Sequence, residues 1–230
     1  MDGHAKTLAI VGIDTDVGKS VVTGLIARHL HLRKKKVTTL KLVQTGCTNQ
    51  SDDILLHRKL MGIPLTKHDE QGITCPYLFP LPASPKLAAK QAKKTIEAEV
   101  LDQATQVLQN EYEWLLVEGA GGLLVPLSSE LLLLDYLKEK KYPLVLVTSS
   151  KLGSINHTRL SLEAIKSRQI QLLGLVYNLY NPSTPAIVQD SLNECRRALK
   201  EYGMDSPVII MPDTGETQSI NWTPLLATLV

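Results

Sequence analysis

The sequence predicts an α/β fold with a doubly wound, mainly parallel sheet and helices on both of its faces. Two observations carry this prediction. Short apolar segments rich in β-branched residues alternate along the chain with longer helical patterns. Apolar character on both faces of such a segment, as in 8–11, is typical of a strand buried in a parallel sheet. Strand, helix and strand repeated in this order imply right-handed crossovers.

The elements follow one another in regular order. Strands are expected at Leu8–Val11, Val37–Val43, Leu115–Val117, Leu144–Val147, Leu173–Val176 and Val208–Ile210. Helices are expected at about 19–32, 54–61, 96–110, 130–140, 155–168 and 187–202. The segment 74–85 carries four prolines, which predicts that it lacks regular structure. It can be a plain connection or a functional loop.

Composition excludes several function classes. The 230 residues fit one domain spanning 1–230, with 43% hydrophobic residues and a net charge of +2. Aromatic residues make up only 4%, which argues against reading nucleic acid by base stacking. The basic run 33–36 is expected to be a solvated connection. No apolar stretch approaches the roughly 20 residues of a membrane span. Three isolated cysteines suggest neither disulfides nor a zinc site, so we expect a cytoplasmic protein. From the composition and charge we also expect that it binds neither nucleic acid nor membrane.

The first loop carries the strongest signal. Residues 12–20 read Gly-Ile-Asp-Thr-Asp-Val-Gly-Lys-Ser and match the phosphate-binding pattern G-x-x-x-x-G-K-[ST] between a buried strand and a helix. Backbone N–H groups of such a turn can point at phosphate oxygens, assisted by the helix N-terminus. Lys19 is expected to reach the β and γ phosphates and Ser20 to bind Mg²⁺. The fold is therefore expected to be of the P-loop NTPase type.

Two acids interrupt this loop. Asp14 and Asp16 flank Thr15 close to the expected position of a polyphosphate. Because carboxylates repel phosphates, these side chains are expected to point elsewhere, to cap the turn, or to contact a cationic second substrate. An ordinary first turn of a helix is the simpler interpretation.

Further polar residues follow the apolar strands. Glu118 comes directly after 115–117, where nucleotide-binding sheets place a second Mg²⁺ contact, although alone it could equally be a surface acid. Lys41 ends an apolar strand and needs water or an anion. In Ser51-Asp52-Asp53, one acid is placed to cap a helix or to bind metal. The turn 151–157 offers free amides to an anion such as a carboxylate.

Together these segments resemble the dethiobiotin synthetase family. Residues 12–20 resemble its loop G-T-D-T-[DE]-V-G-K-[ST], and 117–127 resemble its V-E-G-A-G-G stretch with the following P-L. Residues 41–46 resemble K-P-V-x-[ST]-G, 83–85 resemble x-S-P, and 151–157 resemble K-L-G-x-I-N-H. The sequence departs from the family at Ile13, Leu42 and Thr45. The part after Asn178 is divergent, although Asn178 and residues 211–213 look like the family's nucleotide-contacting positions.

The resemblance implies a cyclo-ligase that forms C–N bonds. It would join 7,8-diaminopelargonate and CO₂ into the cyclic urea of dethiobiotin, using ATP with Mg²⁺ and releasing ADP and phosphate through a carbamate and a carbamic-phosphoric anhydride. It also implies a homodimer with the active site at the interface, in which one subunit holds the carboxylate tail of the substrate bound to its neighbour.

The resemblance assigns roles to particular residues. The implied catalytic residues are Lys41, Lys19 and Thr15, and the implied metal ligands are Ser20, Asp52 and Glu118. The implied substrate contacts are Thr15, Lys41, Thr45, Ser84, Gly153, Ser154 and Asn156. The implied nucleotide contacts are Asp14, Thr15, Asp16, Val17, Gly18, Lys19, Ser20, Val21, Glu118, Gly121, Gly122, Asn178 and Pro212.

Three other functions are compatible with a phosphate loop. A regulatory ATPase switch of the ParA/MinD kind carries an extra lysine early in the loop, where this chain has Ile13 and Asp14. Cobyrinate-type amidating synthetases add a glutaminase domain, for which 230 residues leave no room. A non-enzymatic nucleotide-binding module does not require Lys41, Glu118 and the turn 151–157 together.

Overall fold

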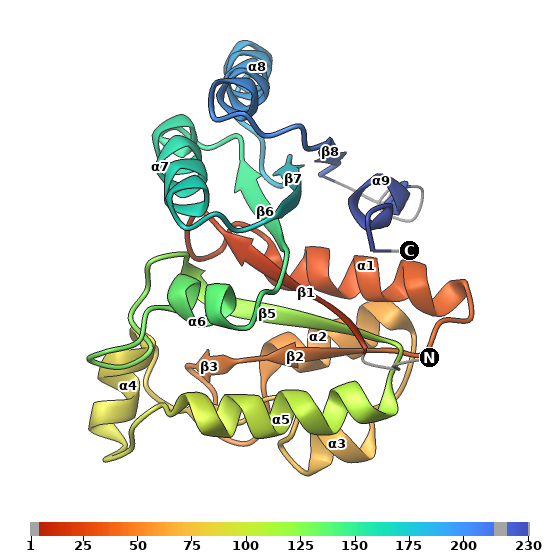
Figure 1. The fold of residues 1–230 in the computed structure, drawn as a ribbon, viewed down its shortest axis with the longest axis vertical. Helices are drawn as coiled ribbons and strands as arrows, with labels where there is room; N and C mark the ends of the chain where they lie inside the picture. The colour runs from red at the N-terminus through yellow and green to blue at the C-terminus, as the bar shows by residue number, and fades with distance from the viewer. Residues whose placement is uncertain (1–4, 214–219, 230) are drawn as a thin grey trace.

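The computed structural model describes residues 5–213 and 220–229. Strands and helices alternate along most of this chain (Figure 1). The strands are β1 (Lys6–Gly12), β2 (Val37–Lys41), β3 (Val43–Thr45), β4 (Tyr77–Phe79), β5 (Trp114–Gly122), β6 (Leu144–Ser149), β7 (Leu172–Asn178) and β8 (Val208–Met211). The helices are α1 (Lys19–Leu32), α2 (Asp52–Met61), α3 (Lys67–Glu70), α4 (Pro85–Gln91), α5 (Ala98–Glu111), α6 (Leu133–Glu139), α7 (Ser154–Ser167), α8 (Pro185–Glu201) and α9 (Thr223–Leu226).

Six strands form the main sheet in the order β2-β5-β1-β6-β7-β8. Every neighbouring pair is parallel, so all six carboxyl ends lie at one edge. The chain runs from β1 outward to β2 and later returns to place β6 on the other side of β1. This arrangement confirms the predicted doubly wound α/β fold, and such folds bind ligands at the carboxyl edge.

Side chains alternate across the sheet into two cores. In β1, Ala9 and Val11 face the core formed with α5, α6, α7 and α8. Leu8 and Ile10 face the core formed with α1 and α9. All four are at most 1% exposed, so the central strand is buried on both faces. Among the described helices, none is long and apolar enough to cross a membrane.

The strand expected over 37–43 divides in two. After Lys41 the chain leaves the main sheet, where Lys41 N–H donates to the Thr74 carbonyl at 2.8 Å and Leu42 N–H to that of Glu118 at 3.1 Å. Residues 43–45 then form β3, which pairs in parallel with β4 in a second, two-stranded sheet. This break turns the residues after Lys41 toward α2.

The expectation that 74–85 lacks regular structure was wrong. The three residues of β4 lie between Pro76 and Pro80, so neither proline removes a donor from the strand, and Pro85 opens α4 at a position that proline tolerates. Helix α6 is shorter than the expected 130–140. The strand expected at 115–117 runs on to Gly122, so Glu118 lies inside β5. The short helices α3 and α9 were not predicted, whereas α4 begins where the resemblance at 83–85 implies a helix.

A buried ion pair joins α2 to α3. Arg58 donates from Nε and Nη2 to the two carboxylate oxygens of Asp69 at 2.8 and 2.7 Å. Thr74 also donates to Asp69, at 2.7 Å, and both members of the pair are buried. Burial opposes the charged carboxylate, but the hydrogen bonds and charge of Arg58 outweigh it and lower the pKa of Asp69 to about 2. The pair therefore fixes Thr74, whose carbonyl holds the end of β2.

Replacing Asp69 should destabilise the fold because the guanidinium of Arg58 stays buried without its counter-charge. We expect Asp69→Asn to lower the free energy of unfolding by about 3 kcal/mol or more at pH 7, measured by denaturant titration. The wild-type contribution is complete above pH about 4 and is lost as the pH falls toward 2, since the folded-state pKa is depressed. Glu139→Gln, which removes an exposed partner of Lys140, serves as control and should change little. Equal stability of Asp69→Asn and wild type at pH 7 would contradict this account.

Candidate active site

A cavity of about 540 Å³ opens at the carboxyl edge of the main sheet. Its walls come from the loop between β1 and α1, from β2, β3, α2 and β5, and from the ends of β7 and β8. The lining residues are Thr15, Asp16, Gly18, Lys19, Ser20, Val21, Lys41, Val43, Gln44, Thr45, Asp53, Leu56, Glu118, Ala120, Gly121, Asn178, Tyr180, Met211, Pro212 and Asp213. The size suits a small-molecule ligand.

The phosphate loop is fixed by its last glycine. Gly18 has φ +96°, in the left-handed region, and precedes the first residue of α1. A Cβ at Gly18 would lie 2.4 Å from Nδ2 of Asn178, so a larger residue does not fit there. That same Nδ2 donates to the carbonyl of Val17 at 2.9 Å. The end of β7 thus supports the loop at the point where α1 begins.

The acids of the loop differ in what they contact. The Asp14 carboxylate accepts the backbone N–H of Thr15 at 2.7 Å, so it caps its own turn, as one of the alternatives above expected. Asp16 lines the cavity. Lys19 Nζ donates to the Asp14 carbonyl at 2.7 Å. Burial and the nearby charge of Lys41 lower the pKa of Lys19 to about 8, which makes its ammonium a group that gains from an added anion.

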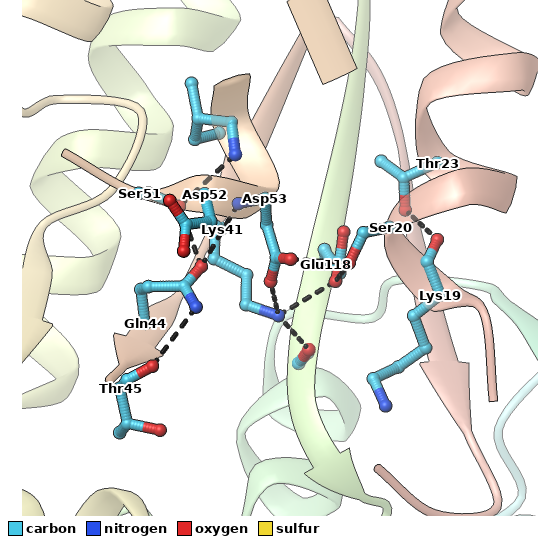
Figure 2. Close-up of polar contacts among 12 residues, drawn as sticks. Lys19, Ser20, Thr23, Lys41, Gln44, Thr45, Ser51, Asp52, Asp53 and Glu118 are labelled. Atoms are coloured by element: carbon cyan, nitrogen blue, oxygen red, sulfur yellow. Dashed lines mark hydrogen bonds and ion pairs between the residues drawn. The ribbon is translucent and has the colours of Figure 1, made fainter. Parts of the chain in front are cut away.

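A charged cluster of Lys41, Asp53 and Glu118 lies beside the loop (Figure 2). Lys41 Nζ lies 2.6 Å from Asp53 Oδ2 and 2.8 Å from Glu118 Oε1, and it also donates to the Gly119 carbonyl. Ser20 Oγ lies 2.8 Å from one oxygen of each carboxylate. Burial alone disfavours every charge here. The carboxylates nevertheless raise the pKa of Lys41, and Lys41 with His57 lowers that of Glu118.

This cluster fits a hard divalent cation. Ser20, Asp53 and Glu118 present only oxygen atoms, which Mg²⁺ prefers. The ammonium of Lys41 already lies where the two carboxylates converge, so the structure itself shows that a cation is stabilised there. Within residues 5–213 and 220–229, His, Cys, Asp and Glu side chains form no group of three that could hold a metal.

The acid that contacts Ser20 is Asp53, and the prediction named Asp52. Both begin α2, but the helix directs Asp53 toward Ser20 and Lys41. Asp52 instead accepts a hydrogen bond from Cys47 Sγ at 3.2 Å. Ser51 caps the helix by accepting from Ile54 N–H. Adjacent helical residues point about 100° apart, so only one of the two acids can face the loop.

The other predicted residues fall into three groups. Thr15, Thr45, Val21, Gly121 and Pro212 line the main cavity together with the loop, whereas Val17 is buried and Gly122 packs against the Ile13 carbonyl. Gly153 and Ser154 line a separate cavity of about 260 Å³ between the starts of α7 and α8. Ser84 and Asn156 are exposed, and the structure places neither of them on the wall of these two cavities.

Two residues that the sequence analysis missed help to shape the site. Gln44 accepts a hydrogen bond from Ser51 Oγ at 2.8 Å and thereby ties β3 to the start of α2. His57 is fully buried and lies 2.7 Å from Glu118 Oε2. His57 follows Asp53 by four residues on a helix, a spacing that puts both on one face and could have indicated it.

Comparisons with known proteins agree on one family. A family model described as an AAA domain matches residues 6–219. An ATP-dependent dethiobiotin synthetase from Pasteurella multocida is 46% identical over 90% of this chain and 97% of its own length. An ATP-dependent dethiobiotin synthetase from Haemophilus influenzae is 53% identical over 76% of this chain and 92% of its own length. A third, from Chlorobaculum tepidum, is 48% identical over 91% and 88%.

Solved structures with the same fold are more distant. A ParA family ATPase from Chlorobium tepidum superimposes with a TM-score of 0.54 at 17% identity, covering 96% of this chain and 89% of its own. MinD from Pyrococcus horikoshii, solved with Mg-ADP, superimposes with a TM-score of 0.53 at 17% identity. The match covers 91% of this chain and 82% of the MinD chain. At this identity the likeness shows the fold alone. Because the sequence relatives span nearly the whole chain, the resemblance drawn from its motifs is confirmed, and the chain belongs to the ATP-dependent dethiobiotin synthetase family.

Proposed function

We propose that this protein uses ATP to close the cyclic urea of dethiobiotin from 7,8-diaminopelargonate and CO₂. One observation supports this most strongly. The phosphate loop, Lys41 and the Asp53–Glu118 carboxylates line a single cavity, so a nucleotide's terminal phosphate and a second substrate can meet there. The identity with curated dethiobiotin synthetases supports the choice of reaction.

The proposed chemistry has three balanced steps. One amine of the diamine forms a bond to the carbon of CO₂ and loses a proton, which gives a carbamate. A carbamate oxygen then attacks the γ-phosphorus while the bond from that phosphorus to ADP breaks. The second amine finally attacks the carbonyl carbon of the mixed anhydride, the carbon–oxygen bond to phosphate breaks, and the ring closes as the amine loses a proton.

Two lysines stabilise the negative charge of these steps. Lys19 extends from the loop that surrounds the phosphates, and Lys41 lies across the cavity beside Glu118. Lys41 has to part from Asp53 and Glu118 to reach a carbamate or a phosphoryl oxygen. Fixed positive charge at the transferring group is the largest expected contribution in phosphoryl transfer. Thr15 and Thr45, both on the cavity wall, orient the diamine and its carbamate.

The chain also offers residues for Mg²⁺. Ser20, Asp53 and Glu118 would hold it, with Asp53 in the role that the sequence assigned to Asp52. When bound, the metal supplies neutralisation of phosphate charge and a fixed orientation of the phosphates. The buried carboxylate of Glu118 serves that purpose because its pKa is held well below the ordinary range, so it stays charged at neutral pH.

The carboxylate tail of the substrate is proposed to lie against the second cavity of a partner subunit. Ser154 starts α7, and its buried Oγ has no hydrogen-bond partner within the described chain. Backbone N–H groups at this helix start favour an anion. A homodimer would bring this turn to the neighbour's active site. Because the loop 12–20 already serves the phosphates, the anion at this turn is better explained as the carboxylate tail of 7,8-diaminopelargonate than as a phosphate.

The function is tested by a labelled product. The purified chain is incubated with 7,8-diaminopelargonate, ¹³C-bicarbonate and MgATP, and dethiobiotin is detected by mass spectrometry together with released phosphate. We expect the label in the urea carbon and one phosphate per product. ATP hydrolysis that needs no diamine and yields no dethiobiotin would instead support the regulatory switch.

Lys19→Gln should lower turnover by a factor of about 10² or more, because one preorganised charge donor is lost. The fold should be unaffected, since Lys19 contacts only the Asp14 carbonyl through its ammonium. Steady-state assays and thermal unfolding check both statements. Lys35→Gln, a change at an exposed lysine outside the site, is the control. Near-wild-type turnover in Lys19→Gln would remove the phosphate-loop assignment.

Nucleotide affinity should fall above pH 8. The ammonium of Lys19 has a pKa near 8 in the free protein, and bound phosphates raise it. Below pH 8 the lysine is already charged; above it, binding must be accompanied by proton uptake. Calorimetry with MgADP should show affinity falling by up to about tenfold per pH unit from pH 8 upward. Lys19→Gln should bind weakly and with a flat profile over this range; the same slope in both proteins would exclude Lys19 as its source.

Asn156→Ala should raise the KM for the diamine more than it lowers kcat, because the tail is remote from the reacting carbamate. Asn193→Ala, an exposed position on α8, serves as control. Mixing inactive Lys19→Gln and Ser154→Glu chains should restore about a quarter of wild-type activity, since half of the dimers are mixed and each has one intact site. Subunit exchange without any recovery would show that one chain supplies the whole site.

A further inference from the structure

A buried chain of polar side chains extends from Glu118 away from the cavity. His57 Nε2 lies 2.7 Å from Glu118 Oε2, and His57 Nδ1 lies 2.9 Å from Thr39 Oγ1. Arg58 Nη1 donates to the same Thr39 oxygen at 2.9 Å. Glu118, His57 and Thr39 are each 0% exposed. These groups therefore interact without competition from bulk water.

Donor and acceptor chemistry fixes the direction of this chain. A guanidinium only donates, so Thr39 Oγ1 accepts from Arg58. The hydroxyl hydrogen of Thr39 is then free for His57 Nδ1, the other polar atom that the structure places at hydrogen-bonding distance from this oxygen. The ionised carboxylate of Glu118 only accepts, so the ring carries a hydrogen on Nε2 and donates it to Glu118. Every donor in the chain then meets an acceptor.

The two oxygens of Glu118 are consequently divided. Oε2 accepts from His57 on the inner side, whereas Oε1 takes Lys41 and Ser20 on the side of the cavity. A carboxylate held by one oxygen cannot rotate without breaking that bond, and the Glu118 side chain is fully buried. The ring thus fixes which oxygen faces the phosphate loop.

We propose that His57 is a positioning residue: it anchors Glu118 through Oε2 so that Oε1 is presented to the phosphate loop and its divalent cation. This proposal rests on the proposed function, since it assigns Glu118 to the metal site. Arg58 and Thr39 complete the support by fixing the ring. Outer hydrogen bonds of this kind typically change metal affinity by about 10- to 100-fold when they are removed.

Two substitutions separate positioning from packing. In His57→Gln, the amide nitrogen of the glutamine can occupy the place of Nε2 and donate to Glu118. In His57→Asn, the amide nitrogen of the shorter asparagine lies near the place of Nδ1 and reaches only Thr39. We expect Asn to raise the Mg²⁺ concentration for half-maximal ADP binding about tenfold, and Gln to stay within about threefold of wild type. The midpoint temperature of thermal unfolding should fall by a similar amount in both variants. An equal Mg²⁺ requirement in the two variants would overturn the proposal.

Two threonines on β2 allow a matched pair of substitutions, which tests whether Thr39 fixes the ring of His57. Thr39→Val removes the hydroxyl between Arg58 and His57, whereas Thr38→Val removes contacts with Arg58, at 3.3 Å, and with the Tyr112 hydroxyl. We expect the Mg²⁺ requirement to rise in Thr39→Val and to stay unchanged in Thr38→Val. The same rise in both would assign the effect to Arg58 and overturn the role of the ring.

A ligand-free measurement needs no variant that must fold. ¹⁵N NMR of the wild-type protein should show His57 with a hydrogen on Nε2. A ring without a hydrogen on Nε2 would overturn the proposal. This result does not depend on the reaction: a protein that makes no dethiobiotin, yet shows the Nε2–H signal and the difference between Gln and Asn, would refute the proposed function alone.

Discussion

The buried carboxylate of Glu118 is the constraint on which the site depends. A charge that is 0% exposed is costly unless it is paired and hydrogen-bonded. Here Lys41 and Ser20 approach one oxygen and His57 the other. Each partner comes from a different element, so satisfying one carboxylate brings α1, α2 and β2 together around β5. The strand that carries Glu118 also lies beside β1, which leads into the phosphate loop. The electrostatics of one side chain thus place the cavity at the carboxyl edge of the sheet.

In the ligand-free site, the charged side chains are paired with groups of the protein itself. Lys41 pairs with both Asp53 and Glu118, and Lys19 turns back to the carbonyl of its own loop. These contacts hold the charges in the cavity before any phosphate arrives, and a ligand has to replace them rather than fill an empty space. That requirement favours polyanions: an uncharged ligand would leave the buried ammonium of Lys19 with no partner beyond a single carbonyl, whereas phosphate oxygens offer it several.

Patterns that are local in the sequence predicted most of the fold and much of the site. The six strands of the main sheet and the loop 12–20 could be read from apolar runs and glycine spacing, and the single domain over 1–230 stays a prediction. What could not be read depended on tertiary contacts. The break after Lys41 arises from bonds to Thr74 and Glu118, which are distant in the chain. Choosing Asp53 over Asp52 requires the exact rotation of α2. The spacing from Asp53 could place His57 on the same face of the helix, but its partner Glu118 is distant in the chain and cannot be read from that pattern.

We propose that the two carboxylates and Ser20 form the place where a cation joins the nucleotide. The most direct test of this proposal is an anomalous difference map from crystals of the full chain grown with Mn²⁺ and ADP, because manganese can be located independently of the protein atoms. We expect one strong peak between Ser20 Oγ and the carboxylates of Asp53 and Glu118, with the ADP phosphates on the loop 12–20. ADP bound on that loop with the manganese peak elsewhere, for example beside Asp14 and Asp16, would contradict it.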